Sequence, residues 1–223
     1  MPLLQGTVFD PSSAGSLDGS QPVLNIGRAN EALVAQLHGK YFTQCYRGNV
    51  FYASTTTAGR VLSFTTITPT YSIWNPAGSG KLCIPFVTLI GWTATNAALG
   101  EIVWMATTAA GDTLSTAGAL APFAAFGTAT PLNANPGSGK VSAMRIATGG
   151  TTTLTAVPTF YRSTGLSTLV TVATTATAAP GWVWRDDWDG GGVIPPGNAI
   201  HLMGSTAIAL ACCITTAYVE VPL

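Results

Sequence analysis

Charged side chains are scarce in this sequence. Nine basic and nine acidic side chains make up 8% of the 223 residues, whereas soluble proteins usually carry about 25%. Because the two signs cancel, no net field attracts nucleic acid or an acidic membrane, and we expect neither as a partner. Low net charge also promotes association, so we predict that much of the surface contacts other protein chains. The alternative is a threonine-faced sandwich that is simply weakly charged.

Long apolar runs and paired cysteine motifs are also missing. No stretch reaches the roughly 18 apolar residues of a membrane span, and the longest candidate, residues 82–92, contains Pro85. The opening MPLLQG does not have the basic and apolar pattern of a signal peptide. The cysteines form no CxxC pair, which argues against a zinc cluster. We interpret them as small buried side chains in a reducing cytoplasm: Cys45, Cys83, Cys212 and Cys213.

The sequence contains no familiar catalytic pattern. There is no GxSxG elbow and no HExxH helix, and the two histidines, His38 and His201, are far apart in the chain. A Ser–His pair can still assemble in space, so the spacing alone does not decide the matter. We predict a protein that is not an enzyme, with no catalytic residue, cofactor or metal.

The stretch Tyr71–Trp92 consists of two apolar segments around the turn Asn75–Gly80, and similar turn chemistry recurs at Asn135–Lys140. Proline fixes φ and glycine permits positive φ, so the chain can reverse within a few residues. We expect both turns to be hairpin loops between core strands. They are not predicted to bind phosphate, because Asn75 takes the first glycine position of that motif and Leu82 replaces its Ser or Thr.

From residue 48 onward, short β-branched or aromatic segments alternate with turn signals, which predicts an all-β protein, a β-sandwich of the jelly-roll kind. Residues 28–44 are ambiguous between helix and strand, and we favour a strand pair with Gly39 at a turn or bulge. A Pro-Pro-Gly turn at residues 195–197 predicts a closing hairpin. The expected strands are residues 50–53, 61–66, 71–74, 82–92, 101–107, 141–146, 153–161, 169–173, 198–203 and 208–221.

The composition changes along the chain and suggests three regions. Residues 1–30 are rich in Gly, Ser, Pro and Asp and cannot bury enough apolar surface to fold alone. We interpret them as an extended arm that lies across a neighbouring chain. Residues 31–223 form a single β-sandwich domain, in which residues 109–139 are a surface insertion.

The densest charge cluster, Arg185–Asp189, lies beside three tryptophans, Trp182, Trp184 and Trp188. We expect a solvated acidic turn, or one that pairs with an arginine of a neighbouring chain. Alternating carboxylates before glycine also resemble a calcium loop, although the regular spacing of an EF-hand is absent. Aromatic faces beside carboxylates would equally suit a sugar ring. These alternatives stay open.

Three segments resemble a group of tailed-bacteriophage virion proteins. They are LHGKYFTQCYRGNVFYAST at residues 37–55, WNPAGSGKL at residues 74–82, and IPPGNAIHL with AYVEVPL near the end. That group shares a HGRYYE-x-x-YRGN-x-F-x-A block, an NPAGSGK turn and a closing PPG…WEE-x-P strand. Lys40 stands where that group usually has arginine, and residues 217–220 replace the Trp-Glu-Glu ending. The resemblance implies a phage structural protein with a β-sandwich or jelly-roll core, and it names no catalytic residues.

We therefore expect a capsid decoration (cement) protein of the virion surface, made in the host cytoplasm. The resemblance implies a homotrimer that contacts the major capsid protein and bridges capsomers. The contact residues that we predict are Leu3, Leu4, Val8 and Phe9 in the arm, with Arg185, Asp186, Asp187, Trp188 and Asp189 as a second contact. The alternative is a head-fibre or tail-tip module that binds a cell-surface glycan, and a third possibility is a jelly-roll shell subunit.

Overall fold

A computed structural model describes residues 40–55, 60–62, 69–92, 100–107, 130–148, 154, 157–168, 183–204 and 211–223. Contacts divide the chain into two units, Met1–Phe42 and Thr43–Leu223, and the described strands all lie in the second. The predicted arm and its contact residues, Leu3, Leu4, Val8 and Phe9, lie outside the described residues. Within the described part, no helix is long and apolar enough to cross a membrane.

The described elements are mainly strands. They are α1 (Phe42–Tyr46), β1 (Val50–Ser54), β2 (Arg60–Val61), β3 (Tyr71–Asn75), β4 (Lys81–Trp92), β5 (Gly100–Thr107), β6 (Leu132–Asn133), the 3₁₀ turn η2 (Pro136–Ser138), β7 (Arg145–Ala147), β8 (Thr159–Thr168), β9 (Val183–Asp187), β10 (Asn198–Gly204) and β11 (Ala211–Pro222).

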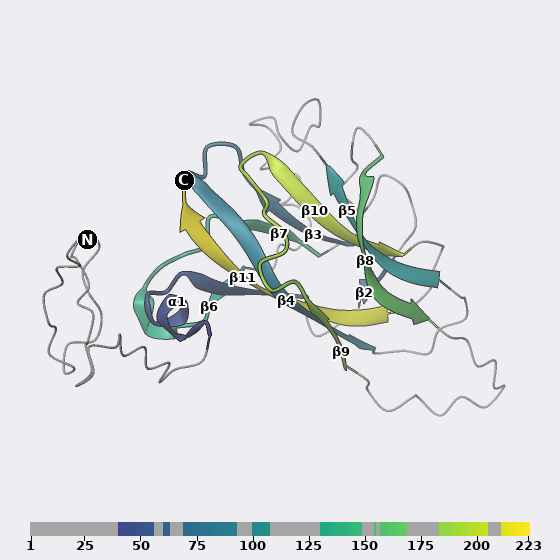
Figure 1. Cartoon of the computed structure of the whole chain (residues 1–223), viewed down its shortest axis with the longest axis horizontal. Coiled ribbons are helices and arrows are strands. Elements are labelled where there is room, and N and C mark those ends of the chain that lie inside the picture. Colours follow the sequence, from purple (N-terminus) through teal and green to yellow (C-terminus); the bar gives the residue numbers. More distant parts are fainter. Residues whose placement is uncertain are drawn as a thin grey trace, which may run out of the picture. The chain divides into compact units, whose positions relative to one another are not determined.

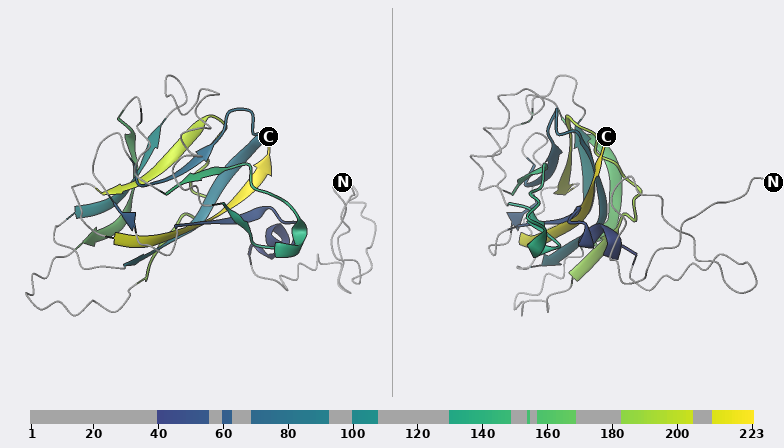
Figure 2. Two further views of the ribbon diagram at one scale, coloured as in Figure 1. Left: turned by 180° about the vertical axis from the view of Figure 1, so that it is seen from behind. Right: turned by 90° about the vertical axis from the view of Figure 1, so that its left-hand side faces the viewer.

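Two antiparallel sheets face each other across the core (Figures 1 and 2). The first sheet has the order β6-β1-β11-β4-β9, with β2 also paired to β11, and the second has the order β7-β3-β10-β5-β8. Without the short strands β2, β6 and β7, eight strands remain, ordered β1-β11-β4-β9 and β3-β10-β5-β8. Successive strands change sheet at each step except from β5 to β8. This is the double Greek key of a jelly roll, so the predicted fold class is confirmed.

The turns that we expected to close hairpins instead carry the chain between the sheets. Residues 75–80 join β3 of the second sheet to β4 of the first, and residues 135–140 lie between β6 of the first sheet and β7 of the second. β10 and β11 also lie in different sheets, so the predicted closing hairpin is wrong. Turn residues fix the local reversal of the backbone, whereas the partner of each strand depends on pairing between distant segments.

Most of the expected strands that fall on described residues are confirmed, and three segments differ. Residues 42–46 are helical, with a backbone hydrogen bond from Arg47 N to Thr43 O, and Gly48 follows at positive φ, as is common after a helix. Residues 141–144 and 157–158 precede strands β7 and β8 rather than belonging to them. The predicted strand at 169–173 and residues 109–129 lie outside the described residues. The remainder of the predicted insertion is anchored, because β6 pairs with β1.

Large side chains from both sheets fill the core. Trp104 is fully buried, and its ring makes edge contacts with Tyr71 and with Trp188, at 6.3 and 5.1 Å between ring centroids. Phe51 stacks on Tyr218 at 5.9 Å. Offset and edge-on ring pairs of this kind contribute more than their buried area alone. Trp74, like Trp104, is a buried core residue.

The two sheets differ in how their outer faces are covered. Every residue of β3 is buried, and so are residues 199–204 of β10, so both faces of the second sheet are buried around these strands. In the first sheet, residues of β11 alternate between buried and partly exposed positions from 211 to 216, so its outer face is partly exposed over this stretch.

Candidate functional site: the β9 segment and the outer face of the first sheet

The charge cluster at residues 185–189 begins as a strand, not as the solvated turn that we expected. Asp186 and Trp188 are each 4% exposed and point into the sandwich, whereas Arg185, Asp187 and Asp189 are exposed. The turn follows, where Asp189 has a φ of 47° and Gly191 N donates to Trp188 O. The period of two along a strand therefore divides the five predicted contact residues into an inner pair and an outer three.

Asp186, on β9 of the first sheet, is held by two side chains of the second sheet. Trp104 Nε1 donates a hydrogen bond of 2.9 Å to Asp186 Oδ2, and Arg162 Nη2 lies 2.7 Å from Oδ1. Burial raises the pKa of the Asp186 carboxyl, and the Trp104 N–H and the Arg162 guanidinium oppose that rise. Because its oxygens are directed inward to these partners, this carboxylate connects the sheets rather than facing solvent.

Trp188 is packed between two residues of β8. The Arg162 guanidinium lies 4.5 Å from the centre of the Trp188 ring, and Tyr161 stacks on the same indole at 5.9 Å. Gly192 passes directly against the ring, because a Cβ atom at this position would lie 2.6 Å from Trp188 Cζ3. With Asp186, these contacts join β9 of the first sheet to β8 of the second and close this side of the sandwich.

Because Asp186 and Trp188 point into the sandwich, they are not available to the sugar-binding site that was the alternative for this cluster. Of the three tryptophans named for that role, Trp188 is buried and Trp182 lies outside the described residues. Trp184 is 38% exposed, and its Nε1 donates to Thr164 O at 3.3 Å. Among the described residues, Trp184 is therefore the one indole of the three that is exposed to solvent. The carboxylate two residues along the strand, Asp186, is buried and out of reach of a sugar.

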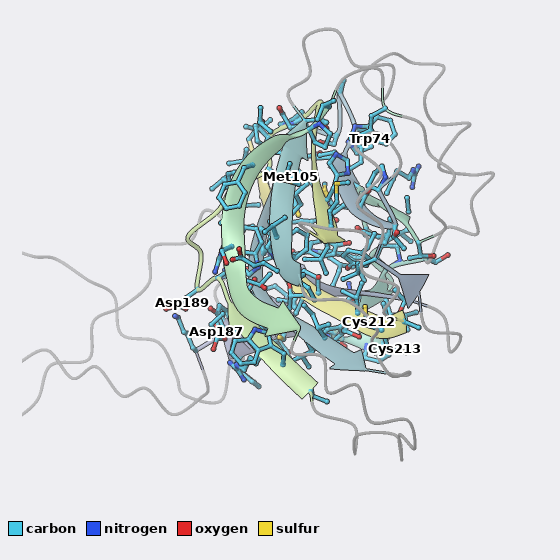
Figure 3. The ribbon with its side chains drawn as sticks, turned by 90° about the vertical axis from the view of Figure 1, so that its right-hand side faces the viewer. Trp74, Met105, Asp187, Asp189, Cys212 and Cys213 are labelled. Carbon is cyan, nitrogen blue, oxygen red and sulfur yellow. The ribbon has the colours of Figure 1, made fainter. Side chains whose placement is uncertain are left out.

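Two charges at the edge of the first sheet neutralise each other. Arg185 Nε donates to both carboxylate oxygens of Asp187, at 2.8 and 2.9 Å. Figure 3 shows Asp187 and Asp189 on one side of the sandwich, away from Trp74 and Met105. Among the described residues, no group of three or more His, Cys, Asp or Glu side chains is arranged to hold a metal ion, which leaves the calcium alternative without a described ligand set.

The outer face of the first sheet is almost entirely uncharged. Side chains paired across antiparallel strands share a face, so the register places Tyr52, Ala217, Val87 and Asp187 in one row, and Ser54, Thr215, Leu89 and Arg185 in the next. Both charges of these rows lie on β9. The apolar side chains that the register assigns to this face are Val50, Tyr52, Leu82, Ile84, Val87, Leu89, Leu132, Val183, Cys213, Ala217, Val219 and Val221. Of these, Val50 and Ala217 are buried.

A solvent-facing antiparallel sheet normally alternates apolar inward residues with polar outward residues. Here the outward set is largely apolar as well, and five of its apolar members are exposed: Tyr52, Leu89, Leu132, Val183 and Val221. The chemistry of this surface suits contact with another apolar surface. Sequence reasoning missed it, although the continuous apolar run of β4, LCIPFVTLIGW, is typical of a strand whose two faces are both covered.

A buried Ser–His pair does form, on the second sheet. Ser72 Oγ and His201 Nδ1 lie 2.7 Å apart, and Thr107 Oγ1 lies 3.0 Å from His201 Nε2. His201 and Ser72 are both fully buried, and burial lowers the pKa of His201 to about 3. A neutral imidazole between two hydroxyls satisfies its own hydrogen bonds, and substrate cannot reach it in this conformation.

The segments that carry the phage resemblance make contacts that hold the fold together. In the Tyr46–Asn49 block, Tyr46 O accepts from Asn135 Nδ2, and Gly48 O accepts from Asn133 Nδ2, both at 2.9 Å. In the Asn75–Lys81 turn, Asn75 Nδ2 donates to Lys81 O and to Ile194 O, both at 2.8 Å. The resemblance therefore rests on scaffold residues rather than on a binding pocket.

The closing strand contains a buried acid. Glu220 is 2% exposed, and Lys81 Nζ lies 2.7 Å from its Oε2. Its Oε1 accepts hydrogen bonds from Ser142 Oγ and from Ala143 N, at 2.5 and 2.9 Å, while the Tyr218 hydroxyl donates to Ser142 Oγ at 2.6 Å. The acid thus fastens the segment before β7 to β11 and β4. The four cysteines are free thiols: Cys83 and Cys212 are buried as expected, whereas Cys45 and Cys213 are only partly buried, so the prediction is wrong for these two.

Comparison of the sequence with models of known protein families gives no match, and comparisons with curated proteins and with solved structures give none either.

Proposed function

We propose that this protein is a structural component of a tailed-phage virion, a capsid decoration (cement) protein that binds the major capsid protein. The observation that supports it most is the strand order of an eight-stranded jelly roll, an architecture used repeatedly in viral coats. Lectins and other proteins share this architecture, so the support from the fold is an analogy. The sequence resemblance described above favours the virion among these uses.

The surface chemistry fits such a role. A cement protein works mechanically, by contacts that bridge neighbouring subunits, and permanent interfaces of this kind are large and apolar. The chain has few charges overall, and the described part of the first sheet exposes several apolar side chains on its outer face. In this proposal, the arm and the exposed residues Arg185, Asp187 and Asp189 contact the shell, and the protein is a homo-oligomer, with three copies implied by the resemblance.

Copy number per virion tests the proposal. Quantitative mass spectrometry of purified particles would compare this protein with the most abundant shell protein. A decoration protein should be present at a fixed ratio, at or simply related to one copy per shell subunit. A handful of copies per particle would contradict decoration and point to a tail or vertex fibre, while complete absence from particles would contradict a virion role altogether.

The proposed contribution of the arm has its own test. Deleting residues 1–20 leaves the whole second unit, Thr43–Leu223, in the protein. The truncated protein should fold, as shown by circular dichroism, but should no longer sediment with particles that lack the wild-type protein. Binding equal to that of the full chain would contradict a role for the arm in attachment.

A further inference from the structure

We infer that Asp189 and Gly190 form a site of spontaneous backbone modification, at which Asp189 converts to isoaspartate through a cyclic succinimide. The reaction needs no enzyme and no cofactor, and the inference stands independently of the proposed virion role. The two residues lie in the exposed turn that follows β9.

The turn after β9 has a backbone that favours aspartate followed by glycine. Gly191 N donates a hydrogen bond of 2.6 Å to Trp188 O, so Asp189 and Gly190 occupy the two central positions. Both have a positive φ, 47° and 80°, as the central residues of a type I′ turn do. Among the described residues, Asp189 is the one residue other than glycine with a positive φ. Because Asp-Gly is one of the few dipeptides that this kind of turn prefers, the fold itself favours the pair at this place.

The reacting atoms of this pair are the Gly190 backbone nitrogen and Asp189 Cγ. The nitrogen attacks Cγ of the protonated carboxyl, a C–N bond forms, and the carboxyl hydroxyl leaves with the amide proton as water, which closes a five-membered ring. Water then opens the ring. Cleavage of the bond to Cγ restores aspartate, whereas cleavage of the bond to the main-chain carbonyl carbon leaves the backbone running through the side chain, as isoaspartate. One water is lost and one is regained, so the reaction needs no other reactant.

The surroundings of Gly190 leave its nitrogen open to this reaction. Asp189, Gly190 and Gly191 are all exposed. A Cβ atom on Gly190 would meet nothing within 4 Å, so neither a side chain of its own nor a packed neighbour crowds the nitrogen. Among the described residues, none accepts a hydrogen bond from Gly190 N, so the attack breaks no hydrogen bond. The glycines also give the backbone the freedom to rotate toward the geometry of the ring.

The two aspartates of β9 lack this combination of features. Asp187 precedes Trp188, whose side chain crowds the nitrogen that would attack, and Trp188 N already donates to Phe86 O at 3.0 Å. Asp186 is buried, and its carboxylate is held by groups of the second sheet. We therefore expect the modification at residue 189 and not at its neighbours.

The modification should loosen the packing of Trp188. The chain is anchored on both sides of the turn, because Trp188 N donates to Phe86 O before it and Ile194 N donates to Cys83 O after it. The isoaspartyl linkage adds one methylene to the backbone between these anchors. Gly192, which lies in the same stretch, already passes against the Trp188 ring without room for a Cβ atom. The added length therefore acts directly on the contact that closes this side of the sandwich.

Prolonged incubation of the full chain in neutral buffer tests the inference. Protein isoaspartyl methyltransferase transfers a methyl group from S-adenosylmethionine to isoaspartate and not to ordinary aspartate. Trypsin then separates residues 186–223 from Asp18-Gly19, the second Asp-Gly pair of the sequence, which lies outside the described residues. We expect methyl label that increases with time in the 186–223 fragment. The bond between Trp188 and Asp189 should become resistant to endoproteinase Asp-N in step, since that enzyme does not cleave before isoaspartate.

Two variants and a peptide give the comparison. Asp189→Glu keeps the charge but would need a six-membered ring, which closes far more slowly, so the label in the 186–223 fragment should be lost. Asp187→Glu is the matched control, because it makes the same change at an exposed aspartate that no glycine follows, and it should be labelled like the wild type. A synthetic peptide of residues 186–193 sets the time of incubation. An unlabelled 186–223 fragment from the folded chain when the peptide has half converted, or label that persists in Asp189→Glu, would overturn the inference.

Discussion

Gly48 lies so close to Ser138 that a Cβ atom on Gly48 would be 2.5 Å from the Cβ atom of Ser138. Gly48 also has a φ of 68°, where residues with a Cβ atom are strained. The contact joins the end of α1 to η2, two segments about 90 residues apart. Only glycine therefore satisfies both the backbone and the contact at this position.

We expect Gly48→Ala to destabilise the protein by about 2–4 kcal/mol, of which about 1–2 kcal/mol is backbone strain and the rest is the clash. Urea unfolding followed by fluorescence would measure it. Gly78→Ala is the matched control, because Gly78 has a φ of 83° but nothing within 4 Å of its added Cβ, so it should show the strain alone. Equal losses in the two variants would mean that the contact with Ser138 does not matter.

Removing the buried acid of β11 should be costly, and the cost should depend on the replacement. Glu220→Ala leaves Ser142 Oγ, Ala143 N and Lys81 Nζ without their acceptor, and we expect a loss of about 3 kcal/mol or more. Lys81→Met should cost less, about 1–3 kcal/mol, because the buried Glu220 carboxylate loses its countercharge but keeps its two other donors. Chemical denaturation of both variants measures the difference, and a larger loss for Lys81→Met would contradict this account.

Removing Arg162 should destabilise the protein in a pH-dependent way. Arg162→Met leaves the Asp186 carboxylate buried with the Trp104 N–H, and we expect a loss of about 1–3 kcal/mol at neutral pH. Burial already raises the pKa of Asp186, and loss of the guanidinium raises it further. An acid with a raised pKa in the folded state is favoured when protonated, so the deficit of the variant should shrink as the pH falls toward 4.

Adding Asp186→Asn to Arg162→Met tests the same pair at fixed pH. Asparagine keeps an oxygen for the Trp104 N–H but carries no charge, so the double variant should be more stable than Arg162→Met alone at pH 7. Thermal unfolding would show this as a higher Tm. A double variant that is less stable than Arg162→Met would mean that the Asp186 carboxylate does not destabilise the fold when its countercharge is missing.

The jelly-roll class could be predicted from the sequence because strand residues and turn residues alternate along it. The route of the chain between the sheets could not be predicted. Residues 75–80 have the chemistry of a tight reversal, and that chemistry is the same whether the next strand pairs with the previous one or enters the opposite sheet. The inward position of Asp186 was hidden for a similar reason. A carboxylate between Arg185 and Asp187 would be predicted to face solvent. Its two hydrogen-bond partners, Trp104 and Arg162, are distant in sequence, so their contact with Asp186 could not be predicted.

The same limit applies to the candidate site. The predicted cluster at residues 185–189 does contribute three exposed side chains to the surface, so the prediction of an exposed cluster is correct for these three residues. The apolar outer face was not predicted, because it exists only once the register brings Tyr52, Ala217 and Val87 into one row. Glu220 shows the converse, since an acid near the C-terminus would be expected on the solvent side and is instead buried with Lys81.

His201 should make the protein sensitive to acid. Its pKa is lowered to about 3 by burial, whereas a histidine in the unfolded chain titrates near 6.5. Between these values the unfolded state binds one more proton than the folded state, so stability falls as the pH falls below about 6.5. At pH 5 this histidine alone should cost about 2 kcal/mol relative to pH 7.5.

The comparison with His201→Gln isolates this contribution, because His38 and all the carboxylates titrate in both proteins. Glutamine can still form hydrogen bonds with Ser72 and Thr107 but has no proton to gain in this range. Urea unfolding at pH 7.5 and pH 5 should therefore show that the wild type loses about 2 kcal/mol more than the variant on acidification. Equal losses would mean that His201 is accessible to protons in the folded state, and the buried Ser72–His201–Thr107 arrangement would then have to open in solution.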